Sequence, residues 1–373
     1  MRFSFTAEQD EFRATLRRAF AARSPTTEVR RLMATEAGYE RDAWDRLNSE
    51  LGLTAVAIPE AYGGAGFGAG ELCIVLEEMG RSLLCAPYFA TAAMAATVIQ
   101  KAGTEAEKRE LLPMLASGKS TATLAYTGAG PSLEAVGAGV VATRSGTGWR
   151  LSGAVSPVLD GLTADLLVVA ASGAVGAGLS LFTIQGKPAG LTRQPLRTMD
   201  ETRKFARLVL DRVEARPLGE IGGAGEAVAA TLRELYAYLA NEMVGGAERL
   251  REDALAYVKM RMQFGRSIAS FQATKHKAAD MLVDVELAKS AAYCAAAAID
   301  EADPEAPALA SLAKAAACDA YLQTAIHAVQ MHGGIGFTWD NDTHLWFKRA
   351  KSSEVLFGDA NAHRELLVRQ WKA

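Results

Sequence analysis

The spacing of hydrophobic and polar positions divides the chain into three regions. In the first, about residues 1–118, Thr6 and Gln9 fit the S/T-x-x-E/Q pattern of a helix capping box, and apolar residues then recur at every fourth position. The run ELCIVLEEMGRSL predicts a later helix that ends near Gly80. The Gly-rich segment between them, Ile58 to Glu71, lacks the lysine of a phosphate-binding loop. We interpret it as a tight connection between helices.

Short β-branched or alternating runs mark the second region, about residues 119–216. They are separated by Gly, Ser and Pro, and they read STATLAYTG, GVVATRSGTGWRLSG, ADLLVVAAS, LSLFTIQ and FARLVLDRVEA. Strands at this spacing predict a small antiparallel barrel or sandwich.

Long Ala-rich runs return in the third region, about residues 225–373. Those from Glu286 to Ile299 and from Leu309 to Gln330 flank a D-P-E-A-P break, which predicts helices joined by a short connection. Long helices with short breaks predict a four-helix bundle. We therefore expect an α+β protein with an N-terminal helical domain, a middle β-domain and a C-terminal bundle.

Composition narrows the class of protein. The formal net charge of −3 provides no general basic surface, which argues against nucleic acid as a partner. The four cysteines lie far apart without a C-x-x-C pair, which argues against a metal site or a disulfide framework and favours a reducing compartment. The N-terminus is polar and acidic, and the longest uncharged stretch, Leu166 to Gln185, is interrupted by glycines. We expect a cytoplasmic protein with no membrane span.

Two motifs in the third region point to a particular chemistry. Arg261 to Gln272 read RMQFGRSIASFQ, and Gln330 to Thr338 read QMHGGIGFT, where backbone amides beside glycines can approach an anion. Together with the earlier IPEAYGGAG, they resemble the acyl-CoA dehydrogenase family, whose patterns are R-x-x-F-G-x-x-I-x-x-F-Q and Q-x-x-G-G-x-G. The resemblance covers the whole chain. It implies the family's fold of helical domain, β-domain and four-helix bundle, with FAD bound at a dimer interface.

The family's reaction needs a carboxylate that removes the proton α to a thioester carbonyl, while a hydride passes from the β-carbon to the flavin. In many members this glutamate precedes the glycine of an E-G-T segment, and Phe357 stands in its place here. In other members it lies on the first long helix of the bundle, at the position of Leu235; a one-residue gap would place Glu234 there. The other titratable residues near Phe357 are interpreted as surface or solvated-turn residues: Glu354, Asp359 and His363.

The resemblance also separates the family's flavin contacts into two sets. The set around a subunit's own isoalloxazine ring is altered here. Its T-E-P-x-x-G-S-D loop reads AYTGAGPSL at residues 125–133, without the acidic residue. In the next strand motif, Pro157 replaces a tryptophan and Leu159 replaces a threonine whose hydroxyl lies near flavin N5, and leucine has no donor to offer there.

The other set reaches the FAD pyrophosphate and adenosine of the neighbouring subunit, and it is present in full. By resemblance its members are Arg261, Phe264, Gln272, Gln330 and Gly334. Arginine suits a phosphate because its planar, permanently charged group forms paired hydrogen bonds. Taken singly, Arg261 would be interpreted as a surface ion pair and Phe264 as core packing.

These features favour a subunit that completes the FAD site of a catalytic partner, as in heterotetrameric actinobacterial members that act on steroid side chains. Such an enzyme would dehydrogenate a bulky acyl-CoA and pass electrons to an electron-transfer flavoprotein. Two alternatives remain open. One is a homodimeric or homotetrameric flavoenzyme that uses Glu234 or performs other flavin chemistry. The other is a scaffold of the same fold that binds no flavin.

Overall fold

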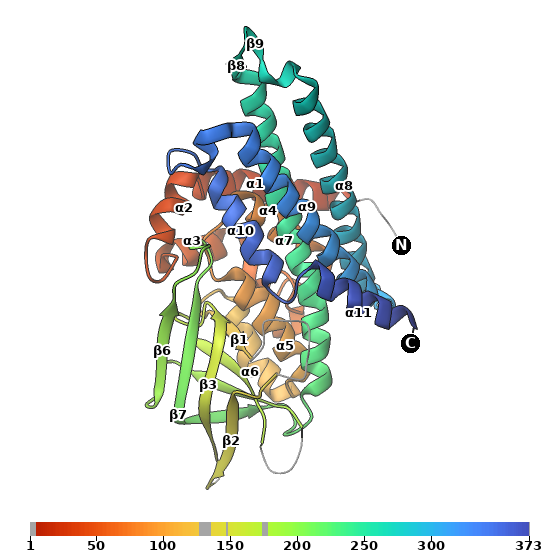
Figure 1. Ribbon diagram of the computed structural model, residues 1–373. Helices are drawn as coiled ribbons and strands as arrows, with labels where there is room; N and C mark the ends of the chain where they lie inside the picture. Colours follow the sequence, from red (N-terminus) through yellow and green to blue (C-terminus); the bar gives the residue numbers. More distant parts are fainter. Residues whose placement is uncertain (1–4, 127–135, 147, 174–177, 373) are drawn as a thin grey trace. The chain divides into compact units, whose positions relative to one another are not determined.

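The computed structural model describes residues 5–126, 136–146, 148–173 and 178–372 (Figure 1). The chain forms two compact units, and each is described by itself. One unit comprises Met1–Arg30, Ala69–Leu84 and Tyr236–Ala373, and the other comprises Arg31–Gly68 and Cys85–Leu235.

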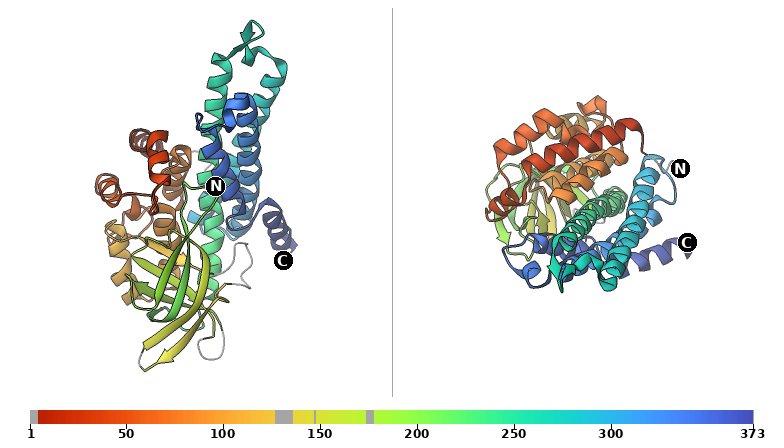
Figure 2. Two further views of the ribbon diagram at one scale, coloured as in Figure 1. Left: turned by 60° about the vertical axis from the view of Figure 1, so that its left-hand side comes forward. Right: turned by 90° about the horizontal axis from the view of Figure 1, so that it is seen from above.

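The first unit is built of helices. Two of them extend beyond it: α2 continues past Arg30, and the part of α7 before Tyr236 belongs to the second unit. The helices are α1 (Ala7–Arg23), α2 (Thr26–Met33), α4 (Ala69–Ser82), α7 (Gly225–Met260), α8 (Gln272–Asp300), α9 (Ala306–His332), α10 (Thr343–Val355) and α11 (Ala360–Lys372). Between α7 and α8 lie β8 (Met262–Gln263), β9 (Arg266–Ser267) and η4 (Ile268–Ser270), and η5 (Gly333–Phe337) follows α9. In Figures 1 and 2 the long helices α7, α8 and α9 run side by side, and α9 packs against α8, α10 and α11.

Local sequence signals explain where several of these helices begin and end. Thr6 and Gln9 form the expected capping box at α1, with both reciprocal hydrogen bonds present. The D-P-E-A-P segment separates α8 from α9 as predicted, and α9 ends at His332, before Gly333, whose φ of +68° favours glycine. The helix α7 ends at Met260, five residues before Gly265. A short hairpin with its turn at Phe264 and Gly265 follows it.

The helices α4 and α7 approach each other closely because two glycines lie between them. A Cβ atom at Gly80 would lie 1.9 Å from the carbonyl oxygen of Glu242. A Cβ atom at Gly245 would lie 1.9 Å from the carbonyl oxygen of Glu77. Any larger residue would separate the two backbones.

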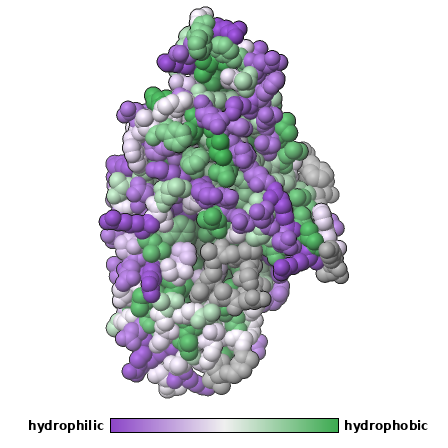
Figure 3. Space-filling model, viewed as in Figure 1, coloured by the Kyte–Doolittle hydropathy of each residue, from purple (hydrophilic) through white to green (hydrophobic). Residues whose placement is uncertain are grey.

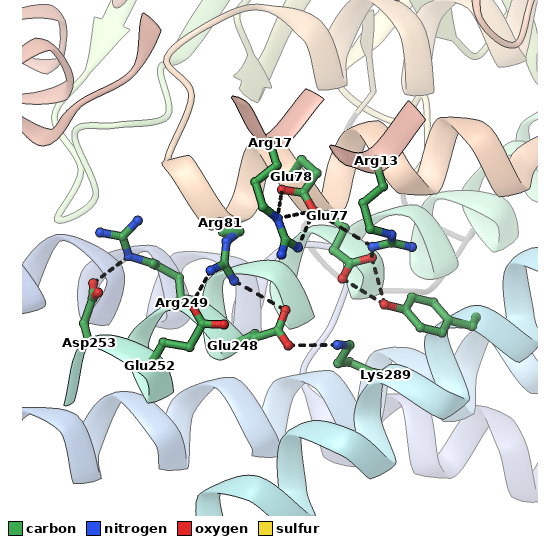
Figure 4. A network of polar contacts seen from close by, with 11 residues as sticks. Arg13, Arg17, Glu77, Glu78, Arg81, Glu248, Arg249, Glu252, Asp253 and Lys289 are labelled. Carbon is green, nitrogen blue, oxygen red and sulfur yellow. Dashed lines mark hydrogen bonds and ion pairs between the residues drawn. The ribbon is translucent and has the colours of Figure 1, made fainter. Parts of the chain in front are cut away.

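A network of ion pairs joins α1, α4, α7 and α8 inside this unit (Figure 4). Burial raises the pKa of Glu77, and the charge of Arg13 and a hydrogen bond from Tyr293 oppose that rise. Because buried carboxylates are tolerated only with partners, the network favours one arrangement of the four helices. Its pairs are Arg13–Glu77, Arg17–Glu78, Arg81–Glu248, Arg81–Glu252 and Lys289–Glu248.

The second unit contains a curled seven-stranded sheet (Figures 1 and 2). Its order is β1-β4-β5-β7-β3-β2, with β6 also paired to β7. The strands are β1 (Ala122–Ala125), β2 (Val140–Ser145), β3 (Gly148–Leu159), β4 (Leu166–Ala171), β5 (Ser180–Gln185), β6 (Leu191–Leu196) and β7 (Phe205–Leu218). Its helical segments are α3 (Arg41–Leu51), η1 (Leu53–Ala55), η2 (Glu60–Tyr62), the π-helical η3 (Phe89–Ala95), α5 (Ala96–Ala102) and α6 (Glu105–Ala116).

The sheet differs from the sequence-based expectation in two respects. The strands β1 and β4 pair in parallel, with Ala122 opposite Leu166, whereas only antiparallel pairs were expected. The strand β6 was not expected; half of its residues are exposed, and it includes Pro195, which is tolerated at a sheet edge. The α+β class and its helical, β and helical order are confirmed. In the described part of the chain, every helix is too short or too polar to span a bilayer.

Candidate functional site

The loop that carries Phe357 joins α10 to α11 and is held from two sides. Phe357 is 1% exposed and has a φ of +62°, which is rare for a bulky side chain. Its carbonyl oxygen accepts a hydrogen bond of 3.0 Å from Nε2 of His363. The ammonium of Lys314, itself fully buried, donates to the carbonyl oxygens of Gly358 and Glu354 at 2.9 and 3.2 Å. Phe357, the residue that the resemblance places at the family's glutamate, is thus a buried apolar residue in a well-supported loop.

The prediction that His363 lies in a solvated turn is wrong, because its side chain is fully buried. Burial, together with the charge of Lys314, lowers the pKa of His363 to about 4, so the ring is neutral at pH 7. Asp359 is exposed as expected, and its carboxylate accepts from the amide of Ala362 at 2.9 Å. Glu354 forms an ion pair with Lys351 at 2.5 Å. A signal for the burial of His363 existed: Ala360, His363 and Leu367 share the inward face of α11.

The alternative base positions lie on α7. Leu235 is fully buried. Glu234 forms an ion pair with Lys101 of α5 at 2.6 Å, with side chains 19% and 28% exposed. This pair gives Glu234 a structural partner within its own unit.

The residues expected to reach a neighbouring subunit's FAD all lie in the helical unit and are all exposed. Arg261 follows α7, Phe264 occupies the hairpin turn, and Gln272 begins α8. Phe264 is 90% exposed with a φ of +52°, so core packing does not explain it. Arg261 is exposed and has no ion-pair partner among the described residues, so its guanidinium is available to an external anion.

The other two residues of the expected FAD set, Gln330 and Gly334, lie at the end of α9, close to α8. The side-chain oxygen of Gln330 accepts from Lys277 of α8 at 2.5 Å. The ring of His332 stacks on that of Tyr257 of α7, with centroids 4.3 Å apart. A Cβ atom at Gly334 would meet nothing within 4 Å, so a ligand can approach this backbone closely. An arginine, two amides and an open glycine turn are donors that fit a pyrophosphate, and these residues therefore fit FAD.

The altered ring-pocket positions lie on β3 in the other unit. Pro157 follows a cis peptide bond, and Leu159 is 3% exposed with its carbonyl oxygen bonded to the hydroxyl of Thr123 at 2.7 Å. Neither side chain offers a hydrogen-bond donor. Of the AYTGAGPSL loop, Ala125 and Tyr126 are described, and the remainder lies outside the described residues.

The family is shown by comparison with known proteins. Residues 6–119 match the acyl-CoA dehydrogenase N-terminal domain, and residues 226–371 match the acyl-CoA dehydrogenase C-terminal domain. The chain belongs to the acyl-CoA dehydrogenase family. The family implies FAD as cofactor and oxidoreductase activity.

Individual relatives cover nearly the whole chain. Acyl-CoA dehydrogenase IpdE2 of Mycobacterium tuberculosis is 33% identical over 97% of this chain and 96% of its own length. A chain of the Tcur3481-Tcur3483 steroid ACAD, solved as a variant, is 31% identical with a TM-score of 0.85 and 98% coverage of both chains. A chain of the ChsE4-ChsE5 complex of Mycobacterium tuberculosis is 26% identical with a TM-score of 0.89, covering 100% of this chain and 99% of that one.

Proposed function

We propose that this chain is the non-catalytic subunit of a heterotetrameric, FAD-dependent acyl-CoA dehydrogenase and completes the FAD site of its catalytic partner. The observation that carries the proposal is the contrast between two positions. A buried phenylalanine, Phe357, occupies the place of the family's glutamate, while Arg261 is exposed and unpaired by any described carboxylate. The first position cannot accept a proton, and the second is suited to bind phosphate.

Each exposed residue has a distinct part in holding the cofactor. FAD, when bound, supplies the acceptor for the substrate's hydride. Arg261 would pair with pyrophosphate oxygens, Gln272 and Gln330 would donate amide hydrogen bonds, and Gly334 would admit the cofactor close to its backbone. Phe264 would cover an apolar part of the nucleotide.

The relatives support the choice of substrate and assembly. Two of them come from solved structures whose names join two chains, and one of these names a steroid enzyme. We therefore propose that the substrate of the complex is a bulky acyl-CoA whose acyl group is the side chain of a steroid. An electron-transfer flavoprotein would reoxidise the reduced flavin.

The test is the FAD content and native mass of the chain, expressed alone and then with FAD-binding acyl-CoA dehydrogenase chains of the same organism. We expect a colourless lone chain and a mixed complex with about one FAD per pair of unlike subunits. One FAD per chain in the lone protein, together with acyl-CoA oxidation, would refute the proposal and favour the homo-oligomeric enzyme. In that case loss of turnover in Glu234→Gln would identify the base. A colourless complex in every pairing would favour the scaffold.

A further inference from the structure

Three large apolar side chains are exposed within five residues just after Gly334. Ile335, Phe337 and Trp339 are 43%, 75% and 59% exposed. Single exposed apolar residues are ordinary, but a run of this kind is typical of a surface that another molecule covers. The same unit exposes Met260, Met262 and Phe264 around the β8–β9 hairpin, and hydrophobic atoms lie on the surface at this end of the bundle in Figure 3.

Trp339 is held in place by charged and aromatic neighbours. The Lys348 ammonium lies 4.4 Å from the ring centroid of the indole, and the Arg30 guanidinium carbon lies 5.6 Å from it. His344 packs edge-on at 4.6 Å and is only 8% exposed. Arg30 is in turn fixed by Asp342 at 2.7 Å. An exposed tryptophan ordered in advance loses little conformational entropy on association, and tryptophan and arginine are enriched among residues that dominate binding energy.

One segment of the same unit is strongly positive, whereas Asp340 and Asp342 beside Trp339 are acidic, and Asp342 is paired with Arg30. Residues 254–279, which end α7, form the hairpin and begin α8, contain five lysine or arginine residues and no aspartate or glutamate. A pyrophosphate diester carries one negative charge on each phosphate, so FAD alone leaves about three cations unmatched. An acidic protein face would complement the remaining positive charges. The five cations are Lys259, Arg261, Arg266, Lys275 and Lys277.

We propose that Trp339 is the anchor residue through which this chain recognises its FAD-bearing partner, an acyl-CoA dehydrogenase subunit with an acidic face around an apolar pocket. This inference rests on the proposed function and adds to it the residue that selects the partner. Arg30 and Lys348 are positioning residues for the indole ring.

The experiment compares the dissociation constant of the mixed complex for the wild-type chain, Trp339→Ala, Lys348→Met and Trp371→Ala. The probe is the coexpressed FAD-binding acyl-CoA dehydrogenase chain that pairs with the wild type, followed by native mass and flavin absorbance. Trp371 is a matched control because it is 69% exposed in the same unit, at the end of α11. We expect at least a tenfold weaker complex for Trp339→Ala, a loss of about two- to fivefold for Lys348→Met, and no change for Trp371→Ala.

The outcomes separate the inference from the proposed function. If the wild-type chain forms no mixed, yellow complex, the proposed function and the inference both fail. If the wild type pairs and Trp339→Ala pairs equally well, only the inference fails. It also fails if Trp339→Ala disrupts a dimer of this chain with itself and leaves the mixed complex intact. Trp339→Phe, which keeps a ring between the same cations, is expected to retain most of the affinity and shows that folding is not the cause.

Discussion

The buried ammonium of Lys314 donates a hydrogen bond of 2.9 Å to the carbonyl oxygen of Gly358, the residue that follows Phe357. Helix α9 thereby fixes the loop between α10 and α11 that carries Phe357. The loop is supported a second time by His363, which donates to the carbonyl oxygen of Phe357. The apolar residue at this position is therefore part of a specific, well-packed structure.

Replacing Lys314 by Met is expected to destabilise the helical unit by about 1.5–3 kcal/mol, because buried carbonyl groups would lose a charged donor. Urea denaturation followed by far-UV circular dichroism measures this. Lys351→Met is the control, since its pair with Glu354 is partly exposed and is expected to contribute less than about 0.5 kcal/mol. Equal stability of the two variants would show that Lys314 does not hold the loop.

The burial of His363 predicts a pH dependence of stability. Its pKa is about 4 in the folded chain and about 6.5 in an unfolded chain. Between these values the unfolded state binds more protons, so this contribution is complete above about pH 6.5 and is lost as the pH falls toward 4. The expected slope approaches about 1.4 kcal/mol per pH unit.

Urea denaturation at several values between pH 4.5 and 7 would measure that slope. His363→Gln should flatten it, whereas His276→Gln, which changes an exposed histidine of α8, should leave it unchanged. The same slope in His363→Gln and the wild type would contradict the assignment.

The contact between α4 and α7 predicts that Gly245 tolerates no side chain. In Gly245→Ala the new methyl group would meet the carbonyl oxygen of Glu77, and the helices would have to separate. We expect a loss of about 1–3 kcal/mol in the free energy of unfolding. Gly225→Ala at the start of α7 is the control, because a Cβ atom there meets nothing within 4 Å.

Arg261→Gln is expected to weaken FAD binding by the mixed complex about tenfold or more, since a charged hydrogen bond to phosphate contributes roughly 1.5–3 kcal/mol. Fluorescence titration of the deflavinated complex with FAD measures the affinity. Arg364→Gln removes another exposed arginine, which pairs with Asp319 on the bundle, and should leave the affinity unchanged. Similar affinities for both variants would remove Arg261 from the proposed site.

Both local signals and the family motifs were accessible from the sequence. The capping box at Thr6, the break between α8 and α9, and most strands of the sheet follow from short-range patterns that are fixed by backbone hydrogen bonding and side-chain periodicity. The motifs around Arg261 and Gln330 gave the family, which the domain matches confirm.

Other features were decided only by tertiary packing. His363 looked like a turn residue because a sequence shows a titratable side chain without showing what covers it, and Lys314 gave no sign that it would become a buried donor to a loop 40 residues away. Phe264, taken singly, would be interpreted as core packing, yet it is almost fully exposed, because hydrophobicity alone does not say whether a side chain is covered. The sequence by itself determined the family and most of the helices and strands, since these depend on local chemistry. The tertiary structure alone decided the parallel pairing of β1 with β4, which polar groups are buried and which apolar side chains stay exposed, since these depend on how distant segments cover one another.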